Sequence, residues 1–266
     1  MVTAQDVFAF LDAQAPVRYQ MDFDNAGFLA GNPQSTVRHI LVALDITDDV
    51  IEEAIETGAQ LIVSHHPLIF KPLKRVTADD LTGRKILRMA ANGLSAVCMH
   101  TNLDIAEDGV NDALMATLDA EVTGILEPAG TDDSGRPLGC GRVGLLRETM
   151  EFPAFLQFTA ARLHANGLRY CASSQPVKRL AVCGGSGGDM LELAQALGCD
   201  TFVTADIKYD RFLAAKELGM NLIDADHFCT ENVVIPPLAE SLRVQFPELT
   251  VTVSQRHTKT AQFYMP

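Results

Sequence analysis

The stretch AIETGAQLIVSHHP, residues 54–67, contains the local pattern that decides the fold. A helical pattern ends at Gly58, where a left-handed C-cap favours glycine, and the short apolar run that follows is typical of a buried strand. His65 and His66 come directly after this run, and Pro67 biases His66 toward an extended backbone. In an open α/β sheet, ligands collect beyond the carboxyl ends of the strands. The stretch therefore predicts an α/β unit with a candidate ligand site at a strand end.

The same pattern recurs along the chain and predicts an α/β protein of two similar lobes. Apolar runs alternate with amphipathic helical patterns from Val37 onward, which indicates mostly parallel sheets flanked by helices. The stretch AQALGCDTFVTAD, residues 194–206, repeats the order of helix, glycine and strand, through either an internal duplication or a common βαβ pattern. The Gly/Pro/Asp-rich stretch 127–141 predicts a boundary between lobes 1–126 and 127–266. The C-terminal segment is a candidate to pack back on the first lobe.

Composition and charge disfavour several classes of partner. The 266 residues carry a net charge of −13, and no stripe of Lys and Arg occurs, so nucleic acid and anionic membranes are not expected partners. There is neither a signal-peptide pattern nor an apolar stretch of membrane-spanning length. The six cysteines form no C-x-x-C pair, which favours a reducing compartment. The expected location is the cytoplasm.

Three predicted strand ends carry side chains that could bind a metal ion. The first carries the twin histidines, the second, HTNLD (residues 100–104), has His100 and Asp104, and the third, DADHFCTEN (residues 224–232), has His227 and Glu231. The last two residues are four apart, so one helical turn places them on the same face. Each feature also has a structural alternative: a surface His/Glu pair, one buried and one exposed histidine, or an aspartate that caps the next helix.

Several imidazoles combined with carboxylates suit zinc, iron or manganese and not calcium, which prefers oxygen ligands alone. Five or six such ligands exceed what one tetrahedral ion needs. Two divalent cations that share a carboxylate are therefore predicted in each subunit. Such a pair can convert a bridging water into hydroxide near neutral pH.

The motifs DFDNAG, SHHPLIF, HTNLD, GGSGG, TADIKYD and DHFCTEN occur in this order over nearly the whole chain. This series resembles the Nif-three-like family, also called dinuclear metal-centre hexameric proteins or GTP cyclohydrolase I type 2 homologues, in its short form without the central inserted domain. The resemblance implies a two-lobed α/β fold in a toroidal homohexamer, with a metal site between the lobes. It also implies that His100 orients a ligand or handles protons. The implied metal ligands are His65, His66, Asp104, His227 and Glu231.

The sequence departs from the family pattern at a few positions. Phe23 stands where the family often has tryptophan, which we interpret as a conservative packing change. Asp226 replaces a common glycine and is a candidate to join a metal, whereas Asp210 replaces a frequent histidine.

Other polar groups have open roles. The loop Gly184–Gly188 is interpreted as a tight turn, with phosphate contact as the alternative. Candidates to line the cavity, with turn chemistry and a surface ion pair as alternatives, are Asp24, Asn25, Asp206 and Lys208. Three histidines without suitable ligand neighbours are expected to be structural or exposed: His39, His164 and His257.

Two functional hypotheses follow. One is a dinuclear-metal-dependent hydrolase that acts on a small molecule, with a nucleotide as a candidate, in GTP cyclohydrolase-like or phosphoester-cleaving chemistry. The other is a non-catalytic hexameric ring that handles metal or binds a partner.

Overall fold

The computed structural model describes residues 1–264 and divides the chain into two compact units. The first unit contains Met1–Leu103 and Ile235–Thr258, and the second contains Asp104–Val234 and the chain from Lys259 onward. The division therefore falls after Leu103, whereas the sequence pattern placed it after residue 126. The late segment Ile235–Thr258 belongs to the first unit.

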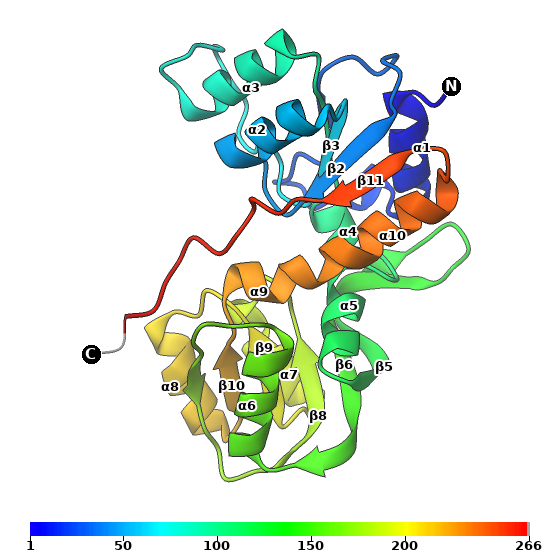
Figure 1. The fold of residues 1–266 in the computed structure, drawn as a ribbon. Helices are drawn as coiled ribbons and strands as arrows, with labels where there is room; N and C mark the ends of the chain where they lie inside the picture. Colours follow the sequence, from blue (N-terminus) through cyan, green and yellow to red (C-terminus); the bar gives the residue numbers. More distant parts are fainter. Residues whose placement is uncertain (265–266) are drawn as a thin grey trace. The chain divides into compact units, whose positions relative to one another are not determined.

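The first unit is built on a five-stranded sheet. Its strands, in spatial order, are β1 (Gly27–Ala30), β4 (Ser95–Cys98), β3 (Leu61–Ser64), β2 (His39–Ala43) and β11 (Thr250–Val253). All neighbours pair in parallel except β1, which is antiparallel to β4. Figure 1 shows α2 (Asp48–Thr57) and α3 (Leu81–Ala91) on one side of this sheet, and α1 (Ala4–Gln14) and α10 (Ile235–Gln245) on the other. The carboxyl ends of four strands consequently lie along one edge.

Local sequence explains how this unit positions its strand ends. Thr47 caps α2 by accepting a hydrogen bond from the Val50 amide, and Gly58 ends the helix at φ +69°, as its position predicted. Helix α2 buries Ile51 against the sheet, next to Ile62 of β3. Every residue of β3 is buried, including Ser64 at its end, and His65 and His66 follow directly after it.

The second unit contains a six-stranded mixed sheet. Its strands, in spatial order, are β5 (Ala120–Thr131), β6 (Pro137–Met150), β8 (Val177–Val182), β9 (Thr201–Thr204), β10 (Asn221–Asp224) and β7 (Arg169–Cys171). Only β8, β9 and β10 pair in parallel, and the other pairings are antiparallel. The prediction of mostly parallel sheets is therefore confirmed for the first unit and wrong for this one.

The predicted lobe boundary, residues 127–141, forms the turn and adjoining strands of a long hairpin. Asp132 accepts hydrogen bonds from the Ser134 and Arg136 amides, and Gly135 adopts a positive φ of 81°. Glycine, proline and aspartate mark tight turns as well as linkers, so composition alone did not separate the two.

Helices cover both faces of the second sheet. Helices α5 (Val110–Thr117) and α6 (Phe152–Arg162) supply buried side chains to one core, which includes Leu114, Phe155 and Val203. The remaining helices are α7 (Leu191–Ala196), α8 (Tyr209–Leu218) and α9 (His227–Glu231). The order β8-α7-β9-α8-β10 matches β2-α2-β3-α3-β4 of the first unit, which fits either a duplication or a shared βαβ pattern.

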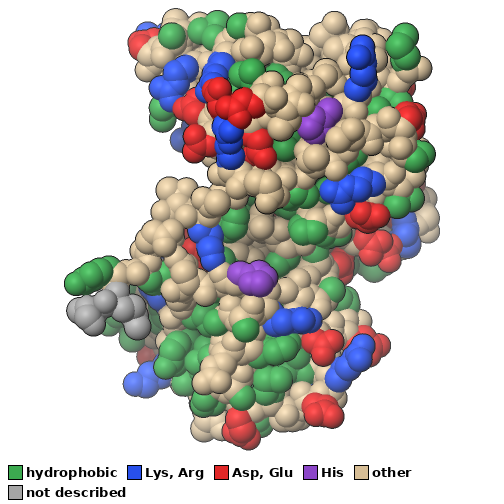
Figure 2. Space-filling view, viewed as in Figure 1, with side chains coloured by type: hydrophobic (Ala, Val, Ile, Leu, Met, Phe, Trp, Pro, Cys, Tyr) green, Lys and Arg blue, Asp and Glu red, His purple; other side chains and the backbone are tan. Residues whose placement is uncertain are grey.

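The described surface carries mixed charges over α2 and α3, where acidic and basic side chains intermingle (Figure 2). Arg84 pairs with Asp48 there, and Arg88 pairs with Glu52. Among residues 1–264, no helix has both the length and the apolar character required to cross a membrane.

Candidate metal site

Three imidazoles of the first unit gather at neighbouring strand ends. His65 and His66 follow β3, and His100 follows β4, its parallel neighbour. The ring centroid of His65 lies 5.0 Å from that of His66 and 5.2 Å from that of His100, and the latter two are 5.5 Å apart. One nitrogen of each ring lies within 4.8 Å of the others, which is close enough for a shared cation.

Acceptor groups hold the Nδ1 atoms of the twin histidines. His65, fully buried, has Nδ1 2.8 Å from the Met99 carbonyl oxygen, and His66 has Nδ1 2.8 Å from Asp45 Oδ1. A carbonyl or a carboxylate can only accept, so Nδ1 must donate in both rings. That arrangement fixes each neutral ring in the tautomer whose Nε2 can bind a metal.

His100 is held in the same way by Asp24. The Asp24 carboxylate also accepts from the Thr101 amide at 3.0 Å and from its hydroxyl at 2.5 Å. Burial would raise the pKa of Asp24, but the hydrogen bonds from His100 and Thr101 outweigh it and lower the pKa to about 2. Asp24 is therefore ionised at neutral pH and orients His100, a more specific role than the cavity lining considered from sequence.

Asp45 was not identified from the sequence, although it follows β2 as His66 follows β3. Its carboxylate accepts from His66 and, at 3.0 Å, from Nε2 of His257. Burial opposes ionisation, but the bonds from His257 and His66 hold the pKa of Asp45 well below its usual range. The only available signal was an acidic residue two positions after a buried strand.

The second unit contains the predicted His/Glu pair. His227 and Glu231 lie at the two ends of α9, and His227 Nε2 is 3.0 Å from Glu231 Oε2. On the other side of the ring, His227 Nδ1 is 2.7 Å from Asp206 Oδ2. Burial alone would lower the pKa of His227, but Glu231 and Asp206 raise it to about 9. His227 therefore lies between two carboxylates, the buried one of Glu231 and the more exposed one of Asp206.

Asp226, considered as an extra metal ligand, is the N-cap of α9. Its Oδ1 accepts from the Cys229 amide at 3.1 Å, and its φ is +71°. The side chain therefore starts the single helical turn that aligns His227 with Glu231.

Asp104 belongs to the same unit as Glu231. The pKa of the buried Cys183 thiol is raised by its hydrogen bond with Cys140, by burial, and by the negative charges of Asp104 and Glu231. Both carboxylates consequently lie near Cys183. Three of the predicted ligands thus belong to the second unit.

The loop Gly184–Gly188 supports Glu231 and offers no cradle of free amides. The amides of three of its glycines are hydrogen-bonded inside the protein: Gly184 to Asn111 Oδ1, Gly185 to Thr230 Oγ1 and Gly187 to Thr204 Oγ1. Gly185 has a φ of +63°, and a Cβ there would collide with the Glu231 carboxylate. These bonds favour the interpretation as a tight turn.

One aromatic ring, Phe70, lies next to His100, and a second, Phe23, lies next to Phe70. Phe23 is 64% exposed and Phe70 43% exposed, and their ring centroids are 6.4 Å apart. The Phe70 ring lies 6.0 Å from His100 at 90°. Phe23 therefore packs edge-on against Phe70 while most of its side chain stays exposed.

Comparison with known proteins gives a consistent result. The family described as Duf34/NIF3 (NGG1p interacting factor 3) matches residues 2–260. A Clostridium acetobutylicum protein named GTP cyclohydrolase 1 type 2 homolog is 35% identical over 85% of this chain and 84% of its own. A Clostridium perfringens protein of the same name is 34% identical over 90% of both chains. The crystal structure of Staphylococcus aureus hypothetical protein SA1388 superposes with a TM-score of 0.92, at 29% identity and over 98% and 99% of the two chains.

The fold and these side chains define a class of α/β protein. Its strand ends carry histidines and carboxylates, the residue types that commonly bind metal ions. The chain belongs to the Duf34/NIF3 family.

Proposed function

We propose that this protein is a dinuclear-metal-dependent hydrolase. In this proposal, the ligands of two divalent cations are His65, His66, Asp104, His227 and Glu231. His100 immediately precedes α4 (Thr101–Ile105), and Asp104 lies within this helix. The mixture of nitrogen and carboxylate ligands suits zinc, iron or manganese.

The observation that carries the proposal is the fixed orientation of four imidazoles. Nδ1 of each ring contacts an acceptor: the Met99 carbonyl, Asp45, Asp24 or Asp206. Metal-binding histidines typically donate the N–H of their second ring nitrogen to such an acceptor. This hydrogen bond orients the ring and makes the nitrogen that binds the metal more basic. Three of these rings, those of His65, His66 and His100, also bring one nitrogen each within 4.8 Å of the others, which structural histidines do not require.

The residues divide into binding and proton-handling roles. Cations bound here would lower the pKa of a coordinated water and polarise the group under attack. His100 lies among the twin histidines, and its ionised partner Asp24 would stabilise the imidazolium formed when His100 accepts a proton. His100 is therefore the proposed general acid and base.

The proposed substrate is a small molecule with a planar ring, and a nucleotide is the first candidate. The relatives' printed name, GTP cyclohydrolase 1 type 2 homolog, motivates this choice. Phe70 lies beside His100 and Phe23 lies beside Phe70, and both partly exposed rings could contact such a ring. We further propose a cytoplasmic homohexamer.

One observation favours a second candidate, a ring that handles metal without turnover. Three amides of the Gly184–Gly188 loop, those of Gly184, Gly185 and Gly187, are bonded to Asn111, Thr230 and Thr204 and are therefore not directed at a phosphate.

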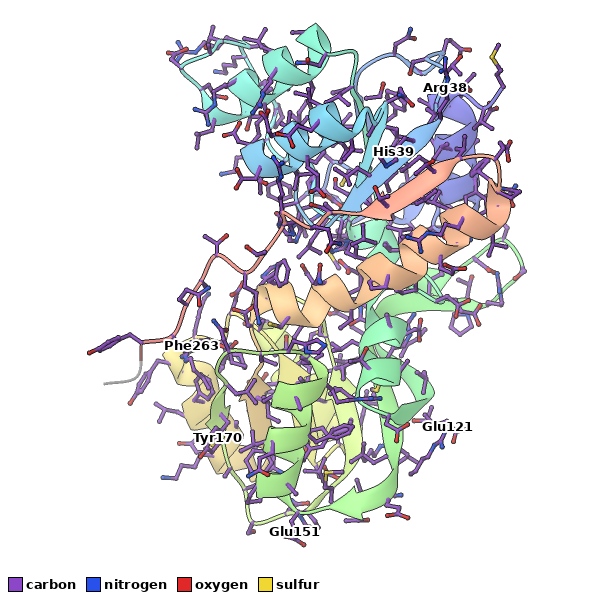
Figure 3. The ribbon with its side chains drawn as sticks, in the orientation of Figure 1. Arg38, His39, Glu121, Glu151, Tyr170 and Phe263 are labelled. Carbon is purple, nitrogen blue, oxygen red and sulfur yellow. The ribbon has the colours of Figure 1, made fainter. Side chains whose placement is uncertain are left out.

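Elemental analysis of the purified protein, followed by an activity screen with the identified metal restored, separates the two candidates. The screen should include GTP, other nucleotides and simple phosphoesters. The hydrolase proposal predicts turnover that a chelator abolishes, that metal restores, and that His65→Ala lacks. His39→Ala is the matched control, because His39, labelled in Figure 3, lies on β2 and bonds Thr252 of the same unit. Tight metal binding with unchanged substrates would favour the second candidate, whereas full turnover by His65→Ala would overturn the first.

A further inference from the structure

We propose that His257 is a positioning residue of the metal centre, which acts by fixing the Asp45 carboxylate and, through it, the ring of His66. This inference rests on the metal centre of the proposed function. It assigns a specific task to a histidine whose surroundings in the sequence suggested none.

Three adjacent parallel strands bring the participating groups together. Strands β3, β2 and β11 are neighbours, with Ser64 paired to Ala43 and Val42 paired to Val253. His66 follows the first strand, Asp45 the second and His257 the third. The carboxyl ends of these strands lie at one edge of the sheet, so residues distant in sequence meet there.

Each oxygen of Asp45 serves one histidine. Oδ1 lies 2.8 Å from Nδ1 of His66, and Oδ2 lies 3.0 Å from Nε2 of His257. With one donor, a carboxylate whose side chain is 41% exposed can rotate and exchange partners with water. A second donor on the other oxygen fixes the carboxylate plane, and thereby the direction in which the His66 ring points.

The segment that carries His257 is itself firmly held. The buried carboxylate of Glu53, on α2, accepts from the Ser254 hydroxyl at 2.5 Å and from the Gln255 amide at 2.9 Å. The Ser254 hydroxyl oxygen in turn accepts from the His257 amide at 3.1 Å. The His257 side chain is only 8% exposed. The backbone is thus fixed independently of the imidazole, so removal of the ring should disturb Asp45 more than it disturbs the segment.

The test compares metal binding by His257→Ala, His257→Gln and the wild type, with each full-length protein first stripped of metal. Cobalt(II) and zinc titrations give affinities, and the visible absorption of bound cobalt reports the geometry of its ligands. His257→Ala should bind roughly 10-fold more weakly, the lower end of the effect expected when such a supporting partner is lost. Its cobalt absorption bands should also shift. His257→Gln should restore both properties, because its side-chain amide can donate to Asp45 from a similar position.

Two controls make the outcomes distinct. His39→Ala removes another histidine that connects β2 to β11, through Thr252, and should leave cobalt binding unchanged. His66→Ala tests the metal centre itself and should lose binding. If His257→Ala proves unfolded by circular dichroism, His257→Met, which fills a similar volume without a donor, replaces it.

Suppose that folded His257→Ala, or His257→Met in its place, keeps the wild-type metal affinity and cobalt absorption while His66→Ala loses metal. That result would overturn the role of His257 and leave the proposed metal centre intact. A weakened His257→Ala that His257→Gln fails to restore would also overturn it, since a structural role would then suffice. Unchanged binding in His66→Ala would overturn the proposed function instead.

Discussion

Asp24 Oδ1 lies 2.6 Å from Nδ1 of His100, and this contact joins the loop before β1 to the end of β4. The carboxylate that makes this contact is fully buried, and its other oxygen is occupied by Thr101. Asp24 therefore combines a fixed orientation with a permanent negative charge beside the imidazole proposed to handle protons.

Asp24→Asn should lower turnover while leaving metal content unchanged. Asparagine has the size of aspartate but no charge with which to stabilise a protonated His100, so we expect kcat to fall by about 100-fold. Metal content by elemental analysis and kcat on the substrate found in the screen check this. Asp22→Asn makes the same substitution at an exposed position of the same loop and serves as a control. A variant that loses its metal would show that Asp24 supports the ligands instead.

Gly185→Ala should damage the Glu231 half-site. The new methyl group would meet the Glu231 carboxylate in a backbone conformation, φ +63°, that alanine disfavours. We expect a loss of about 1–3 kcal/mol of stability together with weaker metal binding.

Gly198→Ala is the matched control for this substitution. Gly198 has a similar φ of +75°, but no heavy atom beyond its chain neighbours lies within 4 Å of the position that a Cβ would take there. The control should share the loss of stability and keep full metal affinity. Equal metal binding in the two variants would contradict the contact between Gly185 and Glu231 as a support of the site.

Glu53→Gln should destabilise the first unit in a manner that depends on pH. Burial works to raise the pKa of Glu53, but the hydrogen bonds from Gln255, Ser254 and Arg256 outweigh it and lower the pKa. A carboxylate with a lowered folded-state pKa contributes stability above its unfolded value and loses that contribution as the pH falls through the folded one.

Urea unfolding checks this prediction. Near pH 7 the variant should be less stable than the wild type by about 1.5–3 kcal/mol, the range for hydrogen bonds to a charged group. The difference should shrink as the pH is lowered below about 4.5, the usual range of glutamate. If the difference in unfolding free energy stays constant as the pH falls well below about 4, the charge of Glu53 does not contribute to stability.

Local patterns predicted much of the candidate site. His65 and His66 are adjacent, and His227 and Glu231 are separated by one helical turn, so chain geometry alone suggested their use. Asp45 and His257 could not be found in this way, because their contact depends on the order of β2 and β11 in the sheet. That order is set by tertiary packing rather than by sequence proximity.

The fold was predictable to a similar extent. The βαβ segments follow from buried apolar runs and from caps such as Gly58. The antiparallel hairpin of β5 and β6 was missed because a turn around Gly135 has the same composition as a linker. Consequently the boundary between the units was placed too late in the chain.

Phe70→Ala should raise KM and leave kcat and metal content nearly unchanged. The exposed Phe70 ring stands perpendicular to His100, where a planar substrate held at the metals would contact it. Loss of one aromatic contact removes about 1–1.5 kcal/mol of binding, which corresponds to a KM roughly 10-fold higher. Val244→Ala, which removes another exposed apolar side chain, on α10, should have no effect. A fall in kcat without a change in KM would instead place Phe70 in support of His100, and equal kinetics in both variants would exclude the aromatic pair from substrate binding.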